Sequence, residues 1–234
     1  PRVMPDGVHC HSDFSLGIMR EQNTRFFLEG RPLLAEAEAI VLIAPGQVHS
    51  CNPVIGLSRG YHMLFFNDAW FTRHIAGQFR NGTAGAPFAL KHPVLSCPAL
   101  YAEAAALVAA AGDEPAGNLE ERFSAFLYSV LRHAGAGPIS EAADSARELP
   151  SALRLNLQSM DDADSGSISG LAEKARMRRE SFSRLVRRRT GLPPMAYRHC
   201  LRIEKGRRLL RQGKSIAEAA FETGYTDQSH FHRM

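Results

Sequence analysis

The chain has 234 residues, 44% of them hydrophobic, and a net charge of +4. A chain of this length can bury one large hydrophobic core or two small ones. No apolar run is long enough for a transmembrane helix. The four cysteines are spread widely without a CxxC pair. Their spacing argues against a disulfide framework and favours a reducing cytoplasm.

Residues 9–66 predict short strands. Apolar runs at Phe14–Ile18, Ile40–Ile43 and Tyr61–Phe66 are separated by turns that contain Gly and Pro. This arrangement is typical of a small β-barrel or sandwich. An alanine-rich helix is expected next, at Pro98–Ala111.

A second helix is predicted after Asn118, which forms a capping-box pattern with Glu121. Its apolar side chains repeat at helical spacing and share one stripe: Leu119, Phe123, Phe126, Leu127, Val130 and Leu131. The two helices should form a hairpin. Its apolar face is expected either to form a homodimer interface or to pack onto the barrel of its own chain.

Residues 134–148 begin with a run rich in Gly and Ala and predict a linker. The charge changes sign beyond it, from a net −4 over residues 1–150 to a net +8 over residues 151–234. Positive charge concentrated in this way is the electrostatic signature of phosphate binding.

The basic third contains one pattern twice, since Ile168–Leu185 is repeated at Ile216–Met234 with an offset of 48 to 49 residues. Each copy holds a small helix, a tight turn and a second helix that carries arginine. This is the pattern of a helix-turn-helix. Between the copies, Pro194–Arg211 predicts a helix of about 27 Å, close to the ~34 Å between successive major grooves on one face of B-DNA.

Three details of the basic third affect the expected stability of its helices and turns. Gly206 should weaken the connecting helix by ~1 kcal/mol unless close packing compensates. Arg176 stands where the second unit has the turn residue Gly224, so the first turn is expected either to be strained by a positive φ or to have a different shape. Arg178 is a poor N-cap for the first recognition helix, whereas the second unit offers Thr226 or Asp227.

Motifs along most of the chain are shared with one family. In the carboxy-terminal third they are Leu171-Ala172, Ser181–Leu185, Gly191, Tyr197, Arg202-Ile203, Leu209-Leu210, Ser215–Ala220 and Gly224–Phe231. In the amino-terminal part they are His9-x-His11-x-x-Phe14 and Pro45-Gly46-x-Val48-His49. With these motifs the chain resembles the AraC family of bacterial transcription regulators, which join a cupin-type sensor to a double helix-turn-helix domain.

The resemblance implies an α+β fold of two domains. Residues 1–133 would form a cupin-like β-barrel (about 1–95) with a helical hairpin (about 98–133), which senses an effector and dimerises. A linker at 134–148 would lead to an all-α double helix-turn-helix domain at 149–234, with its second unit incomplete at the carboxyl end. The implied partners are double-stranded DNA, a small-molecule effector, a second copy of the chain and RNA polymerase, with no membrane.

The resemblance also implies which side chains contact DNA. The first recognition helix should run from about Arg178 to Thr190, with groove-facing residues at i, i+3, i+4 and i+7 spacing. The predicted DNA contacts are Arg178, Arg179, Glu180, Ser183, Arg184, Arg187, Arg188, Gln228, Ser229, His232 and Arg233. Among them, Arg184 is the candidate for bidentate contact to guanine, and Glu180 for accepting from cytosine.

Strand alternation and the family's use of the barrel interior predict an effector pocket. Its expected residues are His11, Phe14, Leu16, His49, Tyr61 and Met63. A tetrahedral metal site of His9, His11, His49 and Cys51 is the alternative, because alternate residues of a strand face the same way. We expect the effector pocket, and no metal or other cofactor.

The predicted function is therefore an effector-responsive, sequence-specific DNA-binding regulator of transcription in the cytoplasm. The alternatives are a metal-dependent cupin enzyme with an accessory helical domain, and an adaptor that binds another protein. No Ser/His/Asp or Cys/His arrangement has persuasive spacing, so we expect no enzyme activity.

Overall fold

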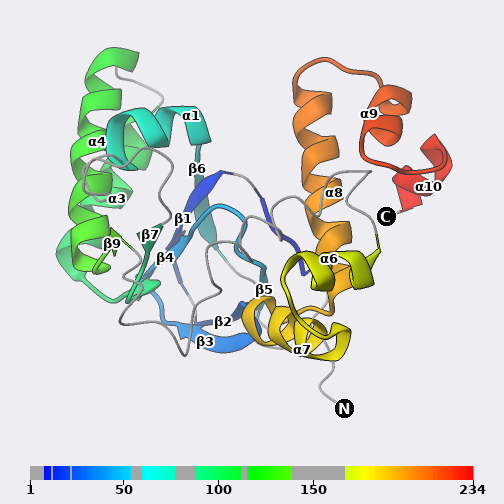
Figure 1. Ribbon diagram of the computed structural model, residues 1–234. Coiled ribbons are helices and arrows are strands. Elements are labelled where there is room, and N and C mark those ends of the chain that lie inside the picture. The colour runs from blue at the N-terminus through cyan, green and yellow to red at the C-terminus, as the bar shows by residue number, and fades with distance from the viewer. Residues whose placement is uncertain are drawn as a thin grey trace.

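Figure 1 shows the computed structural model of the chain, which describes residues 8–11, 13–21, 23–53, 60–76, 88–111, 115–138 and 167–233. Two small sheets occupy the centre. The helices of the amino-terminal domain lie on one side of them and those of the carboxy-terminal domain on the other. The α+β fold with two domains, as predicted, is confirmed.

The amino-terminal domain is built on antiparallel sheets. The first has the order β6-β1-β4-β8, with strands Tyr61–Phe66, Phe14–Met19, Ile40–Ile43 and Val94–Leu95. The second has the order β3-β2-β5, with strands Arg31–Ala35, Thr24–Leu28 and His49–Pro53. A short pair joins β7 (Phe88–Ala89) to β9 (Gly137–Pro138). The three strands predicted from the sequence are all present, to within one residue.

The strand β1 is buried along its whole length because both faces of its sheet are covered. Phe14, Leu16 and Ile18 pack in the core formed with the helices. Met19 belongs to the core between the two sheets, together with Phe26 of β2. The first sheet is thus the middle layer of the amino-terminal domain.

The described part of this domain also holds the helical segments α1 (Asp68–Phe71), the π-helical η1 (Thr72–Ala76), α3 (Pro98–Ala110) and α4 (Ala116–His133). The start of α4 differs from the prediction. Pro115 occupies the N-cap position without a side-chain cap, and its carbonyl accepts from the Leu119 amide. Asn118 therefore lies inside the first turn, and the predicted capping box with Glu121 is wrong.

The only tryptophan of the chain fastens α1 to α4. The indole Nε1 of Trp70 donates to a carboxylate oxygen of Glu120 at 2.6 Å. The ring stacks on Phe66 with centroids 5.6 Å apart and on His74 with centroids 5.2 Å apart. Trp70 therefore packs between the end of β6 and α4, entirely within the amino-terminal domain.

The apolar stripe of α4 packs onto the sheet of its own chain. Phe126, Leu127, Val130 and Leu131 have no exposed surface, and they share one core with β1 and α3. The other two members of the stripe, Leu119 and Phe123, are partly buried against the same core. Of the two alternatives that the sequence left open, a dimer interface and packing within one chain, these side chains thus follow the second.

The predicted linker begins with residues that belong to the amino-terminal domain. Ala134 is fully buried in the core, and residues 137 and 138 form β9. These contacts place the first five residues of the predicted linker, 134–138, in the domain itself. The remainder, 139–148, lies outside the described residues, as does the segment to 166.

The carboxy-terminal domain contains α6 (Ile168–Lys174), α7 (Arg179–Thr190), α8 (Pro194–Arg211), α9 (Ile216–Glu222) and α10 (Gln228–Arg233). The long helix α8 has the predicted bounds, with proline in its first turn where a missing N–H costs nothing. The close packing that would compensate for Gly206 is present: a Cβ at this position would lie 2.5 Å from Cζ of the Phe231 ring. The close approach of α10 to α8 therefore requires glycine.

The part of the chain that the structure describes holds no helix with the length and apolar character needed to traverse a bilayer.

Candidate DNA-binding surface and sensor cavity

The first helix-turn-helix unit consists of α6 and α7. Leu171 and Ala172 of α6 pack with Phe182 and Val186 of α7, and all four are buried. The turn between the helices holds Arg176 at φ +53°, the strained form of the two that the sequence left open. A non-glycine residue in this conformation is strained and is held there by the surrounding structure.

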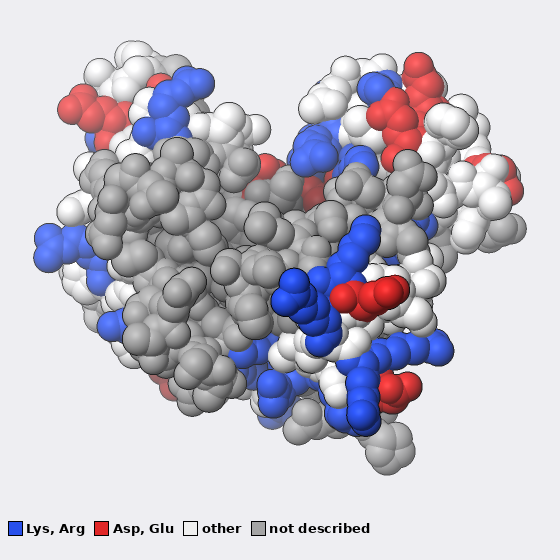
Figure 2. Space-filling view, viewed as in Figure 1, with Lys and Arg blue, Asp and Glu red and all other residues white. Residues whose placement is uncertain are grey.

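The outward face of α7 carries the residues predicted to contact DNA. Arg178, Arg179, Glu180, Arg184, Arg187 and Arg188 are exposed, and Ser183 is half-buried. Figure 2 shows Lys and Arg gathered over α6 and α7. Because Phe182 and Val186 turn fully inwards, the helix offers its polar and cationic face to solvent. A face of this kind fits a DNA major groove.

The second unit, α9 and α10, presents a similar face. Gln228, Ser229 and His232 of α10 are exposed and line a shallow hollow together with Ile216 of α9. The backbone amide of His230 donates to Oδ1 of Asp227 at 2.7 Å, so Asp227 is the N-cap. The side chain of Arg233, the remaining predicted contact, lies outside the described residues.

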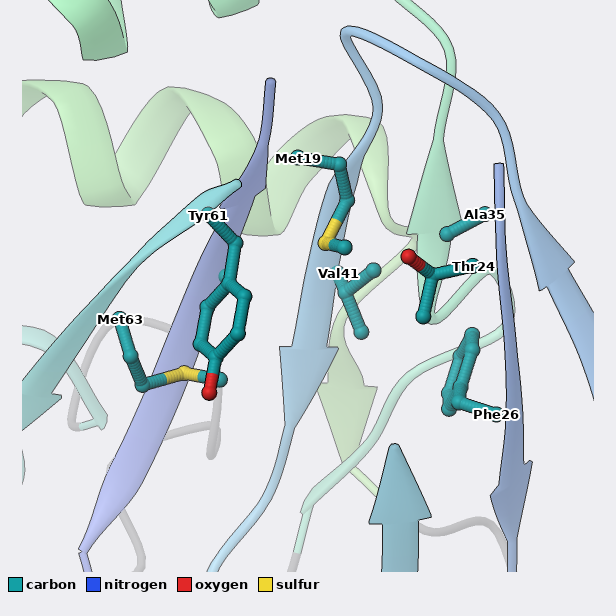
Figure 3. Close-up of a pocket in the computed structure, with 8 residues that line it drawn as sticks. Met19, Thr24, Phe26, Ala35, Val41, Tyr61 and Met63 are labelled. Atoms are coloured by element: carbon teal, nitrogen blue, oxygen red, sulfur yellow. The ribbon is translucent and has the colours of Figure 1, made fainter. Parts of the chain in front are cut away.

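A cavity lies between the two sheets of the amino-terminal domain (Figure 3). Tyr61 and Met63, two residues of the predicted effector pocket, project into it from β6. The rest of its lining was not predicted: Gly17, Met19, Thr24, Phe26, Ala35 and Val41. Phe14 and Leu16 require a correction, because they lie on the opposite face of β1, in the core with the helices.

One polar group stands out in this apolar cavity. Thr24 is 1% exposed, and its hydroxyl finds no hydrogen-bond partner within the described part of the chain. An unsatisfied buried hydroxyl costs roughly 1–3 kcal/mol. Figure 3 shows the Thr24 hydroxyl on the cavity side of β2, across the space from Tyr61. A ligand with a polar group would remove that penalty.

His11 and His49, the other two predicted pocket residues, lie in a cluster with His9. The rings of His9 and His49 have centroids 4.2 Å apart, and those of His11 and His49 have centroids 4.7 Å apart. Burial lowers the pKa of both His11 and His49, the latter to about 3. Both rings are therefore neutral at physiological pH. Cys51, the fourth residue of the metal alternative, has its side chain outside the described residues.

The two domains meet beside this cluster. Cys10 and Val48 of the amino-terminal domain share a hydrophobic core with Leu171, Phe182 and Tyr197 of the carboxy-terminal domain. The first helix-turn-helix unit thus completes its core with residues of the other domain.

Polar and backbone contacts cross the same boundary. Nη1 of Arg211 lies 3.4 Å from Oδ2 of Asp13. A Cβ added to Gly191 would lie 2.6 Å from backbone atoms of Gly30, so backbone meets backbone there. Within the shared core, a hydrogen bond with the Cys200 thiol, reinforced by burial, raises the pKa of Cys10.

Comparison with known proteins agrees with this architecture. A family profile described as AraC-like ligand binding domain matches residues 6–131. The chain belongs to the AraC family. A second profile, described as a helix-turn-helix domain, matches residues 171–234. The chain is thus an AraC-type transcriptional regulator, with an effector-binding domain followed by a DNA-binding domain.

Relatives and solved structures resemble different lengths of this AraC-type chain. It is 23% identical to the uncharacterized HTH-type regulator YbfI of Bacillus subtilis strain 168, over 95% of this chain and 80% of YbfI. It is 35% identical to the activator RhaS of Escherichia coli strain SE11, over 35% of this chain and 31% of RhaS. Apo ToxT of Vibrio cholerae strain SCE256 has the same fold, with a TM-score of 0.58 and 12% identity over 96% of this chain and 84% of ToxT.

Proposed function

We propose that this regulator binds its operator through α7 and α10, placed in successive segments of the major groove. The supporting observation is that both helices bury their aromatic residues and expose their polar face. The helix α8, about 27 Å long at 1.5 Å per residue, spaces the two units. The proposed base-reading residue is Arg184, with Arg187 beside it, one turn further along α7.

Binding of the promoter DNA of its own gene, measured by gel shift across a salt series, tests this proposal. Arg184→Ala should weaken binding to the operator by about 10-fold or more and relax sequence preference at one position. Arg188→Ala should weaken binding to all sequences and reduce the salt slope by about 1. Arg132→Ala, an exposed arginine of α4, is the matched control. Equal affinity for the three variants would contradict the proposal.

We further propose that the space between the sheets, which as it stands has room for about one water molecule, widens to hold the effector, a small and largely apolar molecule with one polar end. Among the described residues, its lining is apolar except for the hydroxyls of Thr24 and Tyr61. Solved structures of ToxT include one bound to an unsaturated fatty acid, at 13% identity to this chain and a TM-score of 0.55. That similarity supports an amphiphilic ligand as the first class to test.

A thermal-shift screen of fatty acids, small aromatic acids, amino acids and sugars tests the cavity. A ligand at a hundredfold its dissociation constant should stabilise the protein by about 2.7 kcal/mol. Thr24→Val keeps the shape of the side chain but removes the hydroxyl, so it should weaken the effect of a polar-ended ligand. Ser50→Ala, a buried hydroxyl outside the cavity lining, is the control. If the ligand shifts the melting temperature of Thr24→Val and wild type equally, a group other than the Thr24 hydroxyl binds its polar end.

We also propose that the chain acts in the cytoplasm, as a homodimer and without enzyme activity, and that it contacts RNA polymerase. A dimer would present four helix-turn-helix units to two half-sites. Because four side chains of the α4 stripe are fully buried within one chain, the dimer needs a surface beyond that stripe. Light scattering with and without operator DNA tests the stoichiometry, and a monomer in both states would contradict it.

A further inference from the structure

Three histidines converge where the amino-terminal segment pairs with β5. The backbones of His9 and His49 form an antiparallel bridge, with N to O distances of 2.9 and 2.8 Å. His11 follows two residues after His9, so alternation along an extended segment brings it to the same side. One ring nitrogen from each histidine lies within 4.8 Å of the others.

Backbone hydrogen bonds orient two of these rings. Nδ1 of His11 lies 2.9 Å from the carbonyl oxygen of Asp13, and Nδ1 of His49 lies 2.9 Å from that of Gln47. A carbonyl oxygen can only accept, so each Nδ1 carries the proton and each Nε2 presents a lone pair. An outer hydrogen bond of this kind is how proteins fix the tautomer and direction of a metal-binding histidine.

We propose that His9, His11 and His49 bind one divalent ion of the late first-row transition series, with Zn²⁺ as the best match. Imidazole nitrogen is a preferred ligand for these ions. Zn–N bonds of about 2.0–2.1 Å in a tetrahedral site place ligand nitrogens about 3.3 Å apart. The ring nitrogens lie within 4.8 Å of one another, so they must approach further when the ion binds. His9, the least buried of the three, leaves a fourth position open to water.

One hydrogen bond to His11 would have to be replaced when the ion binds. Oγ of Ser15 lies 3.2 Å from Nε2 of His11. Since Nε2 is the lone-pair nitrogen, the Ser15 hydroxyl is the donor, and an incoming ion replaces it.

The site also adjoins the boundary between the domains. Residues next to the ligands point the opposite way: Val8, Cys10 and Val48 pack in the core that holds Leu171 and Phe182 of the first helix-turn-helix unit. The same two backbone segments thus carry metal ligands on one side and the domain contact on the other. An ion bound there fixes the segments on which that unit rests.

Metal analysis of the full chain, free of any affinity tag, tests the site. After dialysis against Zn²⁺ and removal of loose metal, wild type should retain one ion per chain. Cobalt titration should give the strong visible absorption of tetrahedral nitrogen coordination. His11→Gln and His9→Ala should each weaken Co²⁺ binding at least tenfold, whereas His92→Ala, an exposed histidine outside the cluster, should leave it unchanged.

Thermal unfolding supplies a second measurement. Zn²⁺ should raise the melting temperature of wild type and of His92→Ala, but not of His9→Ala. Because the His9 side chain is the least buried, His9→Ala keeps the test valid even where a change at His11 impairs folding. Absence of stoichiometric metal from wild type, or equal Co²⁺ affinity in wild type and His9→Ala, would overturn the proposal.

Discussion

The first helix-turn-helix unit, α6 and α7, and the second, α9 and α10, differ in what supports their short helices. The first caps α6 with the Ser167 side chain, but its turn and recognition helix are weakly supported: Arg176 has a positive φ, and Arg178 is an N-cap without a side-chain bond. Its core, however, is completed by Cys10 and Val48 of the amino-terminal domain. Support for this unit is therefore mainly tertiary.

The second unit shows the opposite balance. Ser215 and Glu218 form a complete capping box at the start of α9, and Gly224 occupies the turn at φ +73°. Its core is small, and Phe221 remains 82% exposed. The comparison shows that one sequence pattern can be stabilised by a neighbouring domain or by its own capping residues. Four predictions test this difference.

The largest effect is expected from Phe182→Ala. Phe182 is fully buried in the core shared by the first unit and the amino-terminal domain. Removing its ring should lower the free energy of unfolding by about 3–5 kcal/mol, because a cavity remains. Urea denaturation measures the loss. Phe221→Ala, an exposed phenylalanine of the second unit, should change stability by less than about 0.5 kcal/mol. Similar losses in both variants would show that the units do not differ in this way.

Gly191→Ala tests the backbone contact between the domains. Gly191 has φ +76°, and an added Cβ would collide with Gly30. Gly213→Ala is the matched control, because Gly213 has φ +88° but no described atom beyond its chain neighbours lies within 4 Å of its Cβ position. The control should lose about 1–2 kcal/mol from backbone strain alone. Gly191→Ala should lose a further 1–3 kcal/mol or so from overpacking. Equal losses in denaturation would contradict the contact.

Asp227→Ala probes the local support of the second unit. Loss of the cap at the start of α10 should cost about 1 kcal/mol of unfolding free energy. Asp227→Asn retains an oxygen acceptor and should restore most of the stability. A calorimetric melt of the three proteins measures the difference, and equal destabilisation by Ala and Asn would point to charge rather than capping.

The smallest effect is expected from Arg176→Gly, and it should be stabilising. Glycine relieves a left-handed conformation that costs about 1–2 kcal/mol, but it gives back roughly 0.5–1 kcal/mol of chain entropy. The net gain should be about 0.5–1 kcal/mol in the free energy of unfolding. Gly224→Ala, at the equivalent turn of the second unit, should lose stability. A loss in both variants would mean that Arg176 makes a contact that outweighs its strain.

Features set by near neighbours in the chain could be predicted from the sequence. Proline at the start of α8 and the helical pattern up to Arg211 gave both bounds of that helix. The bounds of α8 depend on residues within a turn or two, so the sequence alone contains that information. The positive φ of Arg176 was one of two alternatives suggested by its alignment with Gly224 in the repeat.

Features that depend on how the sheets and helices pack against one another could not be predicted from the sequence. Every residue of β1 is buried, so alternation could not tell which face meets the cavity, and Phe14 and Leu16 were placed on the wrong one. The α4 stripe likewise showed an apolar face without showing its partner. His9 and His49 are 40 positions apart, and only strand pairing brings their rings together.

Trp70 gives the protein a built-in optical reporter. It is the single tryptophan in the sequence, and its indole is held between Phe66, His74 and Glu120 in the amino-terminal domain. Emission excited at the red edge of the absorption band therefore originates from that domain alone. A change in its intensity when operator DNA is added would show that DNA binding at the distant recognition helices alters the surroundings of Trp70 in the other domain.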